Sequence, residues 1–223
     1  MELPINQIIQ GDCLEVMRQL PDKCIDLCLT DPPYGIKISH TGKIDNTGGV
    51  EYNALKSKEW GKQEWDNATP RQEYFDEILR VSKKVIIFGG NFFTDKLPVH
   101  GGWIVWHKKL VNLKNFSDCE LAWTNFLGRV RYFKFGYIGV DYLNSGDKKD
   151  FHPTQKPKAL MNWCVKEFSK PNDLILDPFL GSGTTAVAAK MEGRNYIGIE
   201  ISEKYCEIAR KRVASAPTPL FTK

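Results

Sequence analysis

The chain has 223 residues, of which 42% are hydrophobic and 26% are charged, as expected for one large globular domain with a sizeable core. Its net charge of +4 and pI near 8.6 are compatible with a polyanionic partner but do not require one. No apolar stretch approaches the roughly 20 residues of a membrane span, so we expect no membrane association.

The cysteines and the N-terminus favour a cytoplasmic protein. The six cysteines show no CxxC spacing and no metal-like grouping with the four histidines, so we expect reduced thiols and no metal site. The N-terminus lacks the basic flank and apolar run of a signal peptide.

The first 34 residues predict a parallel βαβ unit that ends in an acidic turn. Residues 6–10 and 25–30 have the character of strands, and residues 13–20 have helical spacing between them. Two prolines end the second strand at Asp31-Pro32-Pro33-Tyr34. This turn presents a carboxylate, a carbonyl and an aromatic face, which suit a planar ring with an exocyclic amine. An ordinary turn with a solvated Asp31 and a packing Tyr34 is the alternative.

The segment 35–69 is polar, and it is longer than an ordinary connection inside a compact domain. Basic residues such as Lys37 and Lys43, with Trp65 near the end, favour a lid or a phosphate-contacting segment. A solvated connection is the alternative.

The middle of the chain predicts one helix and several strands. Thr69-Pro70 should cap a helix whose buried stripe is Tyr74, Ile78 and Val81. Strands are expected at 85–88, 103–106, 120–123 and 129–135, the last two paired antiparallel, with a short helix at 91–97.

Bases alternate with aromatic residues between positions 103 and 137. Such a mixture can hold unstacked bases and phosphates, and the candidates are Lys108, Lys109, Arg129 and Arg131. Simple alternation in a sheet, with aromatics inward and bases outward, explains most of these residues equally well.

The last third predicts a nucleotide-binding βαβ unit. A turn at 152–157 precedes a helix at 158–168, and a strand at 174–176 leads through Asp177 into a glycine turn and the helix 186–191. The strand 196–199 ends at Glu200, and Ser202 caps the last helix. We expect one domain, residues 1–215, and a tail, residues 216–223, with no linker.

The glycine turn matches neither common phosphate-binding fingerprint, because GxGxxG and GK[ST] are both absent. An acid at the end of the next strand can bind ribose hydroxyls. A nucleoside without a phosphate chain therefore fits better, and S-adenosylmethionine is such a compound.

The motif order resembles that of the beta group of DNA amino-methyltransferases, which place the catalytic motif before the cofactor motif. Asp-Pro-Pro-Tyr comes first, then His-Pro-Thr-Gln-Lys-Pro, then Asp-Pro-Phe-Leu-Gly-Ser-Gly-Thr-Thr and Gly-Ile-Glu. The resemblance runs from Gly11 to Arg212. It implies an α/β, Rossmann-like S-adenosylmethionine-dependent methyltransferase fold: a mostly parallel seven-stranded sheet, helices on both faces and a circularly permuted motif order.

The resemblance also implies the site. Asp31, Pro32, Pro33 and Tyr34 would form the catalytic target-base site, with Asp31 also bordering the cofactor. Phe88-Gly89-Gly90-Asn91 would line it. The remaining cofactor contacts would be Asp12 and Cys13 at the adenine, Glu200 at the ribose, Thr154 and Lys156 closing the methionine pocket, and Asp177, Phe179, Gly181, Gly183 and Thr184 at the methionine end.

The implied activity is transfer of a methyl group to the N6 amine of adenine in double-stranded DNA, after the base flips out and stacks on Tyr34. Asp at the head of the tetrapeptide is typical of adenine enzymes, but an N4-cytosine enzyme stays open. A noncatalytic nucleic-acid-binding subunit is a further alternative, and a protein or small-molecule methyltransferase is the weakest.

The family implies a bacterial or phage-encoded protein in the cytoplasm, with a homodimer or a restriction endonuclease as a possible protein partner. The usual target-recognition region is short here. We therefore expect the segments 35–69 and 124–151 to contact DNA.

Overall fold

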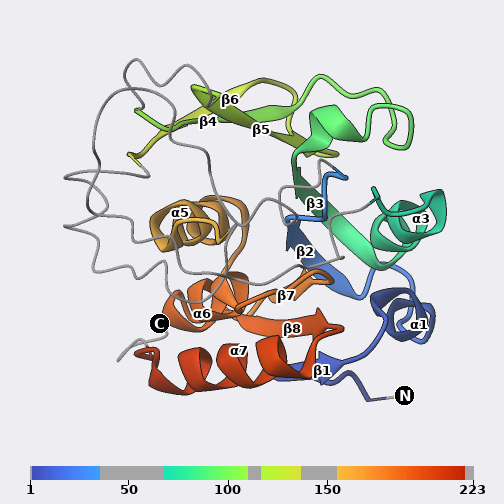
Figure 1. The fold of residues 1–223 in the computed structure, drawn as a ribbon, viewed down its shortest axis with the longest axis vertical. Helices are drawn as coiled ribbons and strands as arrows, with labels where there is room; N and C mark the ends of the chain where they lie inside the picture. Colours follow the sequence, from blue (N-terminus) through green and yellow to red (C-terminus); the bar gives the residue numbers. More distant parts are fainter. Residues whose placement is uncertain (1, 36–67, 110–116, 137–154, 219–223) are drawn as a thin grey trace.

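The computed structural model describes residues 2–35, 68–109, 117–136 and 155–218, which form one sheet covered by helices on both faces (Figure 1). In chain order the elements are β1 (Gln7–Gln10), α1 (Cys13–Arg18), β2 (Ile25–Thr30), α3 (Gln72–Val81), β3 (Ser82–Phe88), the 3₁₀ turn η1 (Gly90–Phe92), β4 (Trp103–His107), β5 (Cys119–Thr124), β6 (Arg131–Lys134), α5 (Lys158–Phe168), β7 (Leu174–Asp177), α6 (Thr184–Met191), β8 (Asn195–Glu200) and α7 (Glu203–Ser215).

The sheet has eight strands among the described residues, in the order β1-β8-β7-β2-β3-β5-β4-β6. The expected count of seven is wrong, although the α/β class and the mostly parallel sheet are confirmed. The first five strands in this order, β1, β8, β7, β2 and β3, run parallel to one another. Strand β5 is antiparallel to both β3 and β4, and β6 is parallel to β4.

The predicted antiparallel pairing of β5 with β6 is wrong. Strand β5 is hydrogen-bonded to β3 on one edge and to β4 on the other. Both of its edges are therefore occupied, and β6 can add only at the free edge of β4, where Ile104 lies opposite Arg131.

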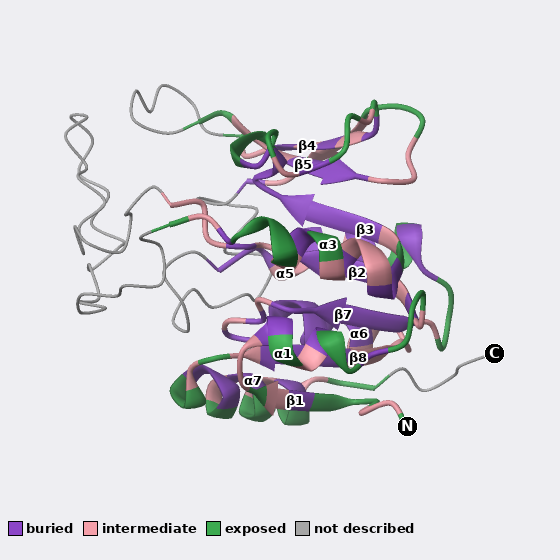
Figure 2. Cartoon of the chain, turned by 90° about the vertical axis from the view of Figure 1, so that its right-hand side faces the viewer, coloured by how far each residue is buried: buried purple, intermediate pink, exposed green. Residues whose placement is uncertain are grey.

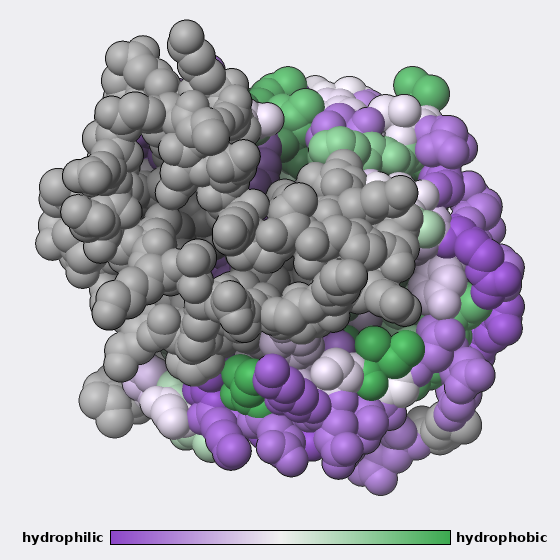
Figure 3. Space-filling model, viewed as in Figure 1, coloured by the Kyte–Doolittle hydropathy of each residue, from purple (hydrophilic) through white to green (hydrophobic). Residues whose placement is uncertain are grey.

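The central strands are buried on both faces, as parallel strands under helices should be. Helices α1 and α3 cover one face, and α5, α6 and α7 cover the other (Figures 1 and 2). Strand β2 illustrates the alternation: Cys28 packs in the core under α1 and α3, whereas Leu27 and Leu29 pack in the core under α5 and α6. The described side chains at the surface in Figure 3 are mainly hydrophilic.

Two predicted helices differ from the structure. Helix α3 begins at Gln72, after Arg71 as N-cap, rather than at Thr69-Pro70, and its buried side chains are Phe75, Ile78 and Val81. Tyr74 lies about 100° around the helix from Phe75 and is only partly buried.

The segment predicted as a helix at 91–97 is not a continuous helix: the 3₁₀ turn η1 ends at Phe92. After η1 the chain makes one separate turn, in which the N–H groups of Lys96 and Leu97 donate to the carbonyl of Phe93, and Pro98 cannot continue it because it has no N–H to donate.

The chain leaves β2 and β7, which are neighbours, toward opposite faces of the sheet: α3 lies on one face and α6 on the other. Ligands of doubly wound sheets bind at such a switch point, outside the carboxyl ends of the strands. No helix of the described residues is long and apolar enough to cross a membrane.

Candidate active site

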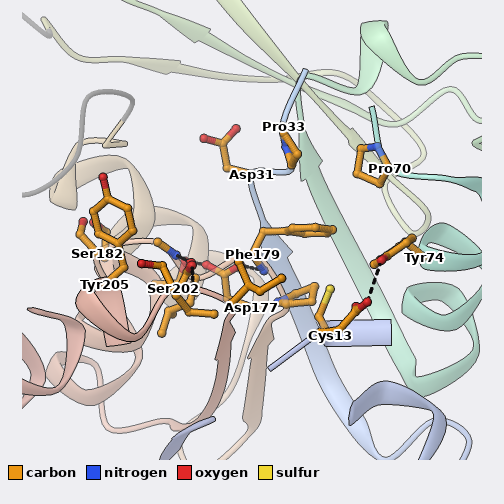
Figure 4. A pocket seen from close by; sticks show the side chains of 18 of the residues that line it. Cys13, Asp31, Pro33, Pro70, Tyr74, Asp177, Phe179, Ser182, Ser202 and Tyr205 are labelled. Atoms are coloured by element: carbon orange, nitrogen blue, oxygen red, sulfur yellow. Dashed lines mark hydrogen bonds between the residues drawn. The ribbon is translucent and has the colours of Figure 1, made fainter. Parts of the chain in front are cut away.

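A cavity of about 560 Å³ opens at the carboxyl ends of β2, β7 and β8 (Figure 4). It brings together residues from both ends of the sequence. The predicted site residues that line it are Asp12, Cys13, Asp31, Pro33, Lys156, Asp177, Phe179, Gly181, Thr184 and Glu200. Lining residues that were not predicted as site residues include Arg71, Tyr74, Gln155, Met161, Ser182, Ser202 and Tyr205.

The glycine turn forms one wall of the cavity. Gly183 has φ +88°, and a Cβ there would lie 2.7 Å from the Cβ of Ala209 on α7. Only glycine tolerates both the left-handed conformation and this close approach. The turn can therefore lie against α7 while Gly181, Ser182 and Thr184 line the cavity.

Glu200 fastens the glycine turn to the end of β8. Its carboxylate accepts N–H bonds from Gly181 and Ser202, both 2.8 Å long. Burial raises the pKa of Glu200. Each carboxylate oxygen keeps a second lone pair, so the predicted contact with ribose hydroxyls remains sterically and chemically available.

Asp177 is 5% exposed and is held by three donors. Its oxygens accept hydrogen bonds from Thr30 (2.7 Å), Thr185 (2.6 Å) and the backbone N–H of Phe179 (3.1 Å). Burial nevertheless raises its pKa to about 6. A cationic ligand group in the cavity would favour the ionised form of Asp177.

Asp12 and Tyr74 form the opposite wall. One oxygen of Asp12 caps α1 by accepting from the N–H of Leu14 at 2.8 Å, and the other accepts from the hydroxyl of Tyr74 at 3.1 Å. The ring centroids of Tyr74 and Phe179 lie 6.1 Å apart. Burial raises the pKa of the neighbouring Cys13 thiol, which therefore stays protonated. The wall suits a flat heteroaromatic ring with a hydrogen-bonding edge.

Asp31 lies at the rim of the cavity with both carboxylate oxygens engaged. Tyr34 donates its hydroxyl to Oδ1, and Lys156 donates to Oδ2 at 2.6 Å. Burial raises the pKa of Asp31, and the charge of Lys156 only partly offsets this effect. Burial would lower the pKa of Lys156, but Asp31 and Glu120 raise it well above its usual value.

Glu120 on β5 is a member of this cluster that sequence reasoning missed. It pairs with Lys108 at 2.6 Å, and its Oε2 lies 3.2 Å from Lys156 Nζ, outside hydrogen-bond geometry. Although burial acts to raise the pKa of Glu120, the two lysines lower it. A carboxylate inside a largely apolar strand was the available sequence signal.

Tyr34 packs behind Asp31 against the turn that follows β3. Its ring stacks on Phe92 at 4.8 Å between centroids, and a Cβ at Gly89 would lie 2.1 Å from its Cε1. Gly89 therefore lies directly against Tyr34, and that the segment 88–91 lines a target-base pocket stays a prediction. Pro32 is buried, and Phe92, which the sequence did not flag, is 42% exposed.

The predicted DNA-contacting residues are dispersed. Lys108 is paired with Glu120, and Arg131 with Glu167 at 2.5 Å, whereas Lys109 and Arg129 are exposed. Buried Trp106 and Trp123 follow the simple alternation in a sheet. Lys37, Lys43, Trp65 and Thr154, with most of 35–69 and 124–151, lie outside the described residues.

The sheet order, the switch-point cavity and the acidic turn at its rim define a Rossmann-like α/β protein with a nucleoside-sized ligand site. Residues 103–211 match the family model described as DNA methylase, for N6 and N4 methyltransferases. The chain is 30% identical over 257 residues to the type II methyltransferase M.HinfI of Haemophilus influenzae, covering 94% of this chain and 68% of that protein.

A second relative is YubD of Escherichia coli (strain K12), which is 32% identical over 230 residues, or 95% of this chain and 91% of YubD. The chain therefore belongs to the N6/N4 DNA methyltransferase family, and S-adenosylmethionine is its cofactor.

Solved structures agree with this fold. The M1.HpyAVI complex with S-adenosylmethionine aligns with a TM-score of 0.56 and 26% identity, over 92% of this chain and 98% of that one. TTHA0409 of Thermus thermophilus, also in complex with S-adenosylmethionine, aligns with a TM-score of 0.58 and 19% identity over 96% of each chain. The cytosine-N4-specific PvuII methyltransferase shares the fold at 18% identity, with a TM-score of 0.56 over 92% of this chain and 85% of that one.

Proposed function

We propose that this enzyme transfers the methyl group of S-adenosylmethionine to the exocyclic N6 amine of adenine in duplex DNA. The observation that carries the proposal is that the acidic turn and the nucleoside-sized cavity are continuous: Asp31 and Pro33 line the same cavity as Asp177 and Glu200. A methyl donor in the cavity and an acceptor at the rim would then be adjacent.

The cofactor would lie along the cavity with its adenine between Asp12, Cys13 and Tyr74. Glu200 would take the ribose hydroxyls. Asp177, Phe179, Gly181, Gly183 and Thr184 would surround the methionine end, and Lys156 with Thr154 would close it. The cavity suits this ligand because carboxylates line it, whereas a phosphate chain would be repelled. When bound, the cofactor supplies an electrophilic methyl group.

Asp31 would accept one N–H of the target amine, and the carbonyl of Pro32 would accept the other. These two acceptors favour a pyramidal nitrogen whose lone pair points at the methyl group, and they stabilise the positive charge that grows on nitrogen. Much of the remaining acceleration would come from holding the two reactants in line. The base must leave the duplex to reach this site and would stack against Tyr34, which Phe92 supports from behind.

The direct experiment combines tritiated S-adenosylmethionine with duplex DNA, followed by separation of the labelled nucleosides. We expect N6-methyladenine, because the tetrapeptide begins with Asp. Label in N4-methylcytosine would assign the enzyme to the other branch of the family. DNA binding without any labelled nucleoside would point instead to a noncatalytic subunit and contradict the proposal.

A further inference from the structure

Four charged side chains and a phenol form a nearly buried cluster behind the acidic turn. Lys156, whose side chain is 8% exposed, lies 2.6 Å from Asp31 and 3.2 Å from both the Tyr34 hydroxyl and Glu120 Oε2. Lys108 lies 2.6 Å from the other oxygen of Glu120 and 5.4 Å from the ring centre of Trp106. These contacts link β5 to the turn that carries Asp31.

The cluster as it stands weakens Asp31 as an acceptor. Lys156 and Tyr34 already donate to its two oxygens. An ionised carboxylate can accept further bonds. However, an ammonium group 2.6 Å away opposes the positive charge that must grow on the target nitrogen, and water screens this repulsion poorly at a buried site.

Glu120 provides the means to relieve this repulsion. Its Oε1 is held by Lys108, while Oε2 is buried and lies 3.2 Å from Lys156 Nζ, which is close enough for an ion pair but is not aligned as a hydrogen bond. A buried carboxylate oxygen without an aligned donor is costly, so it favours a closer approach of this ammonium group.

We propose that Glu120 is a positioning residue for methyl transfer: it takes over the ammonium of Lys156 when the target amine bonds to Asp31. This inference rests on the proposed function of the Asp31 turn. No covalent bond changes in the step, because one hydrogen bond of Lys156 Nζ is exchanged between two carboxylates. Asp31 then keeps its full charge for the amine, and Lys156 stays neutralised by Glu120.

The test is Glu120→Gln, which keeps the shape and removes the charge. We expect kcat to fall by about 10- to 100-fold, the scale for a misplaced catalytic group, with unchanged affinity for S-adenosylmethionine by calorimetry. The groups facing Asp31 are Tyr34, Lys156 and, through Lys156, Glu120. The negative charge of Glu120 raises the pKa of Asp31, so its loss lowers that pKa. The fall of kcat on the acid side of its pH profile should therefore also move to lower pH. A variant with the kcat and the pH profile of the unmodified enzyme overturns the inference.

Two further variants make the test specific. Glu207→Gln removes an acid from an exposed pair with Lys211 on α7 and should change neither kcat nor the acid limb. In a Lys156→Met background, Glu120→Gln should have no further effect on kcat, because Glu120 acts through Lys156. An equally large second loss of kcat contradicts the inference.

A readout without activity separates this inference from the proposed function. The unfolding equilibria of Glu120→Gln, Lys156→Met and the double variant should show a coupling of about tenfold between the two sites. Absence of coupling overturns the role of Glu120 even if the enzyme labels DNA. Coupling without DNA labelling by the unmodified enzyme would contradict the proposed function, and with it the catalytic role of Glu120.

Discussion

Asp31 is the residue whose charge the proposed chemistry needs. Asp31→Ala removes one of the two acceptors for the target amine, and we expect transfer to fall by at least about 100-fold, the scale of losing one preorganised electrostatic contact. The residue lies at the rim of the cavity, so the affinity for S-adenosylmethionine should hardly change. Tritium transfer and calorimetry on the same preparation measure both quantities. Near-normal turnover would rule out the assigned role.

Asp177 should make stability depend on pH. Its pKa is raised from 3.8 to about 6 in the folded protein, so the folded state holds a proton that the unfolded state has already lost between those values. The free energy of unfolding should therefore fall as pH rises from 4 to 7, by about 3 kcal/mol from this group.

Urea unfolding at several pH values in this range, compared with Asp177→Asn, isolates that contribution. Glu200, whose pKa is also raised, remains in both proteins and cancels in the comparison, whereas Asp31 raises the pKa of Asp177, so the difference between the proteins includes that coupling. Parallel pH profiles for the two proteins would show that Asp177 titrates near its ordinary value.

At this scale, the sequence predicts residues that carry their chemistry within a local motif. Asp31, Asp177 and Glu200 each end a predicted strand, and all three line one cavity. Glu120 and Tyr74 were missed because their roles arise from partners 36 and 62 positions away, Lys156 and Asp12, and no local pattern encodes such pairs.

The glycine turn between β7 and α6 is the element on which the cavity depends most directly. Gly183→Ala places a Cβ 2.7 Å from that of Ala209 at a φ of +88°, so we expect the free energy of unfolding to fall by about 1–3 kcal/mol. The affinity for S-adenosylmethionine should fall as well, because the turn must shift.

Gly101→Ala is a matched control, since a Cβ there meets nothing within 4 Å. Urea unfolding and calorimetry on both variants distinguish a specific effect of the turn from a general effect of adding a methyl group. Equal stability of the two variants would contradict the packing argument.

Element positions were more predictable than their pairing. All eight strands were foreseen as segments, because apolar runs bounded by turn residues mark buried strands. The placement of β6 beside β4 depends on β3 having already occupied the other edge of β5, which is a property of the whole sheet.

At the scale of the molecule, the two ends of the sequence build one binding site. The β2 and β7 strands lie side by side although about 150 residues separate them, and Thr30 of one donates to Asp177 of the other. The permuted order of the motifs therefore leaves the arrangement at the switch point intact.

Binding at this junction should stabilise the whole sheet as one unit. Ligand present at 100 times its dissociation constant should add about 2.7 kcal/mol to the free energy of unfolding. Four of the six tryptophans, Trp103, Trp106, Trp123 and Trp163, lie on β4, β5 and α5, whereas the cavity is formed largely by β2, β7 and β8. Trp60 and Trp65 lie outside the described residues. If the domain unfolds cooperatively, tryptophan fluorescence and far-ultraviolet circular dichroism should report the same shift on adding S-adenosylmethionine.

Glu200→Ala is the appropriate control for this linkage. It removes the proposed ribose contact and the carboxylate that holds Gly181 and Ser202. The same cofactor concentration should then stabilise the variant much less, measured against the variant's own unfolding without cofactor. A shift in circular dichroism without one in fluorescence would mean that the segments carrying the tryptophans unfold separately from the junction of β2 and β7, which then does not couple them.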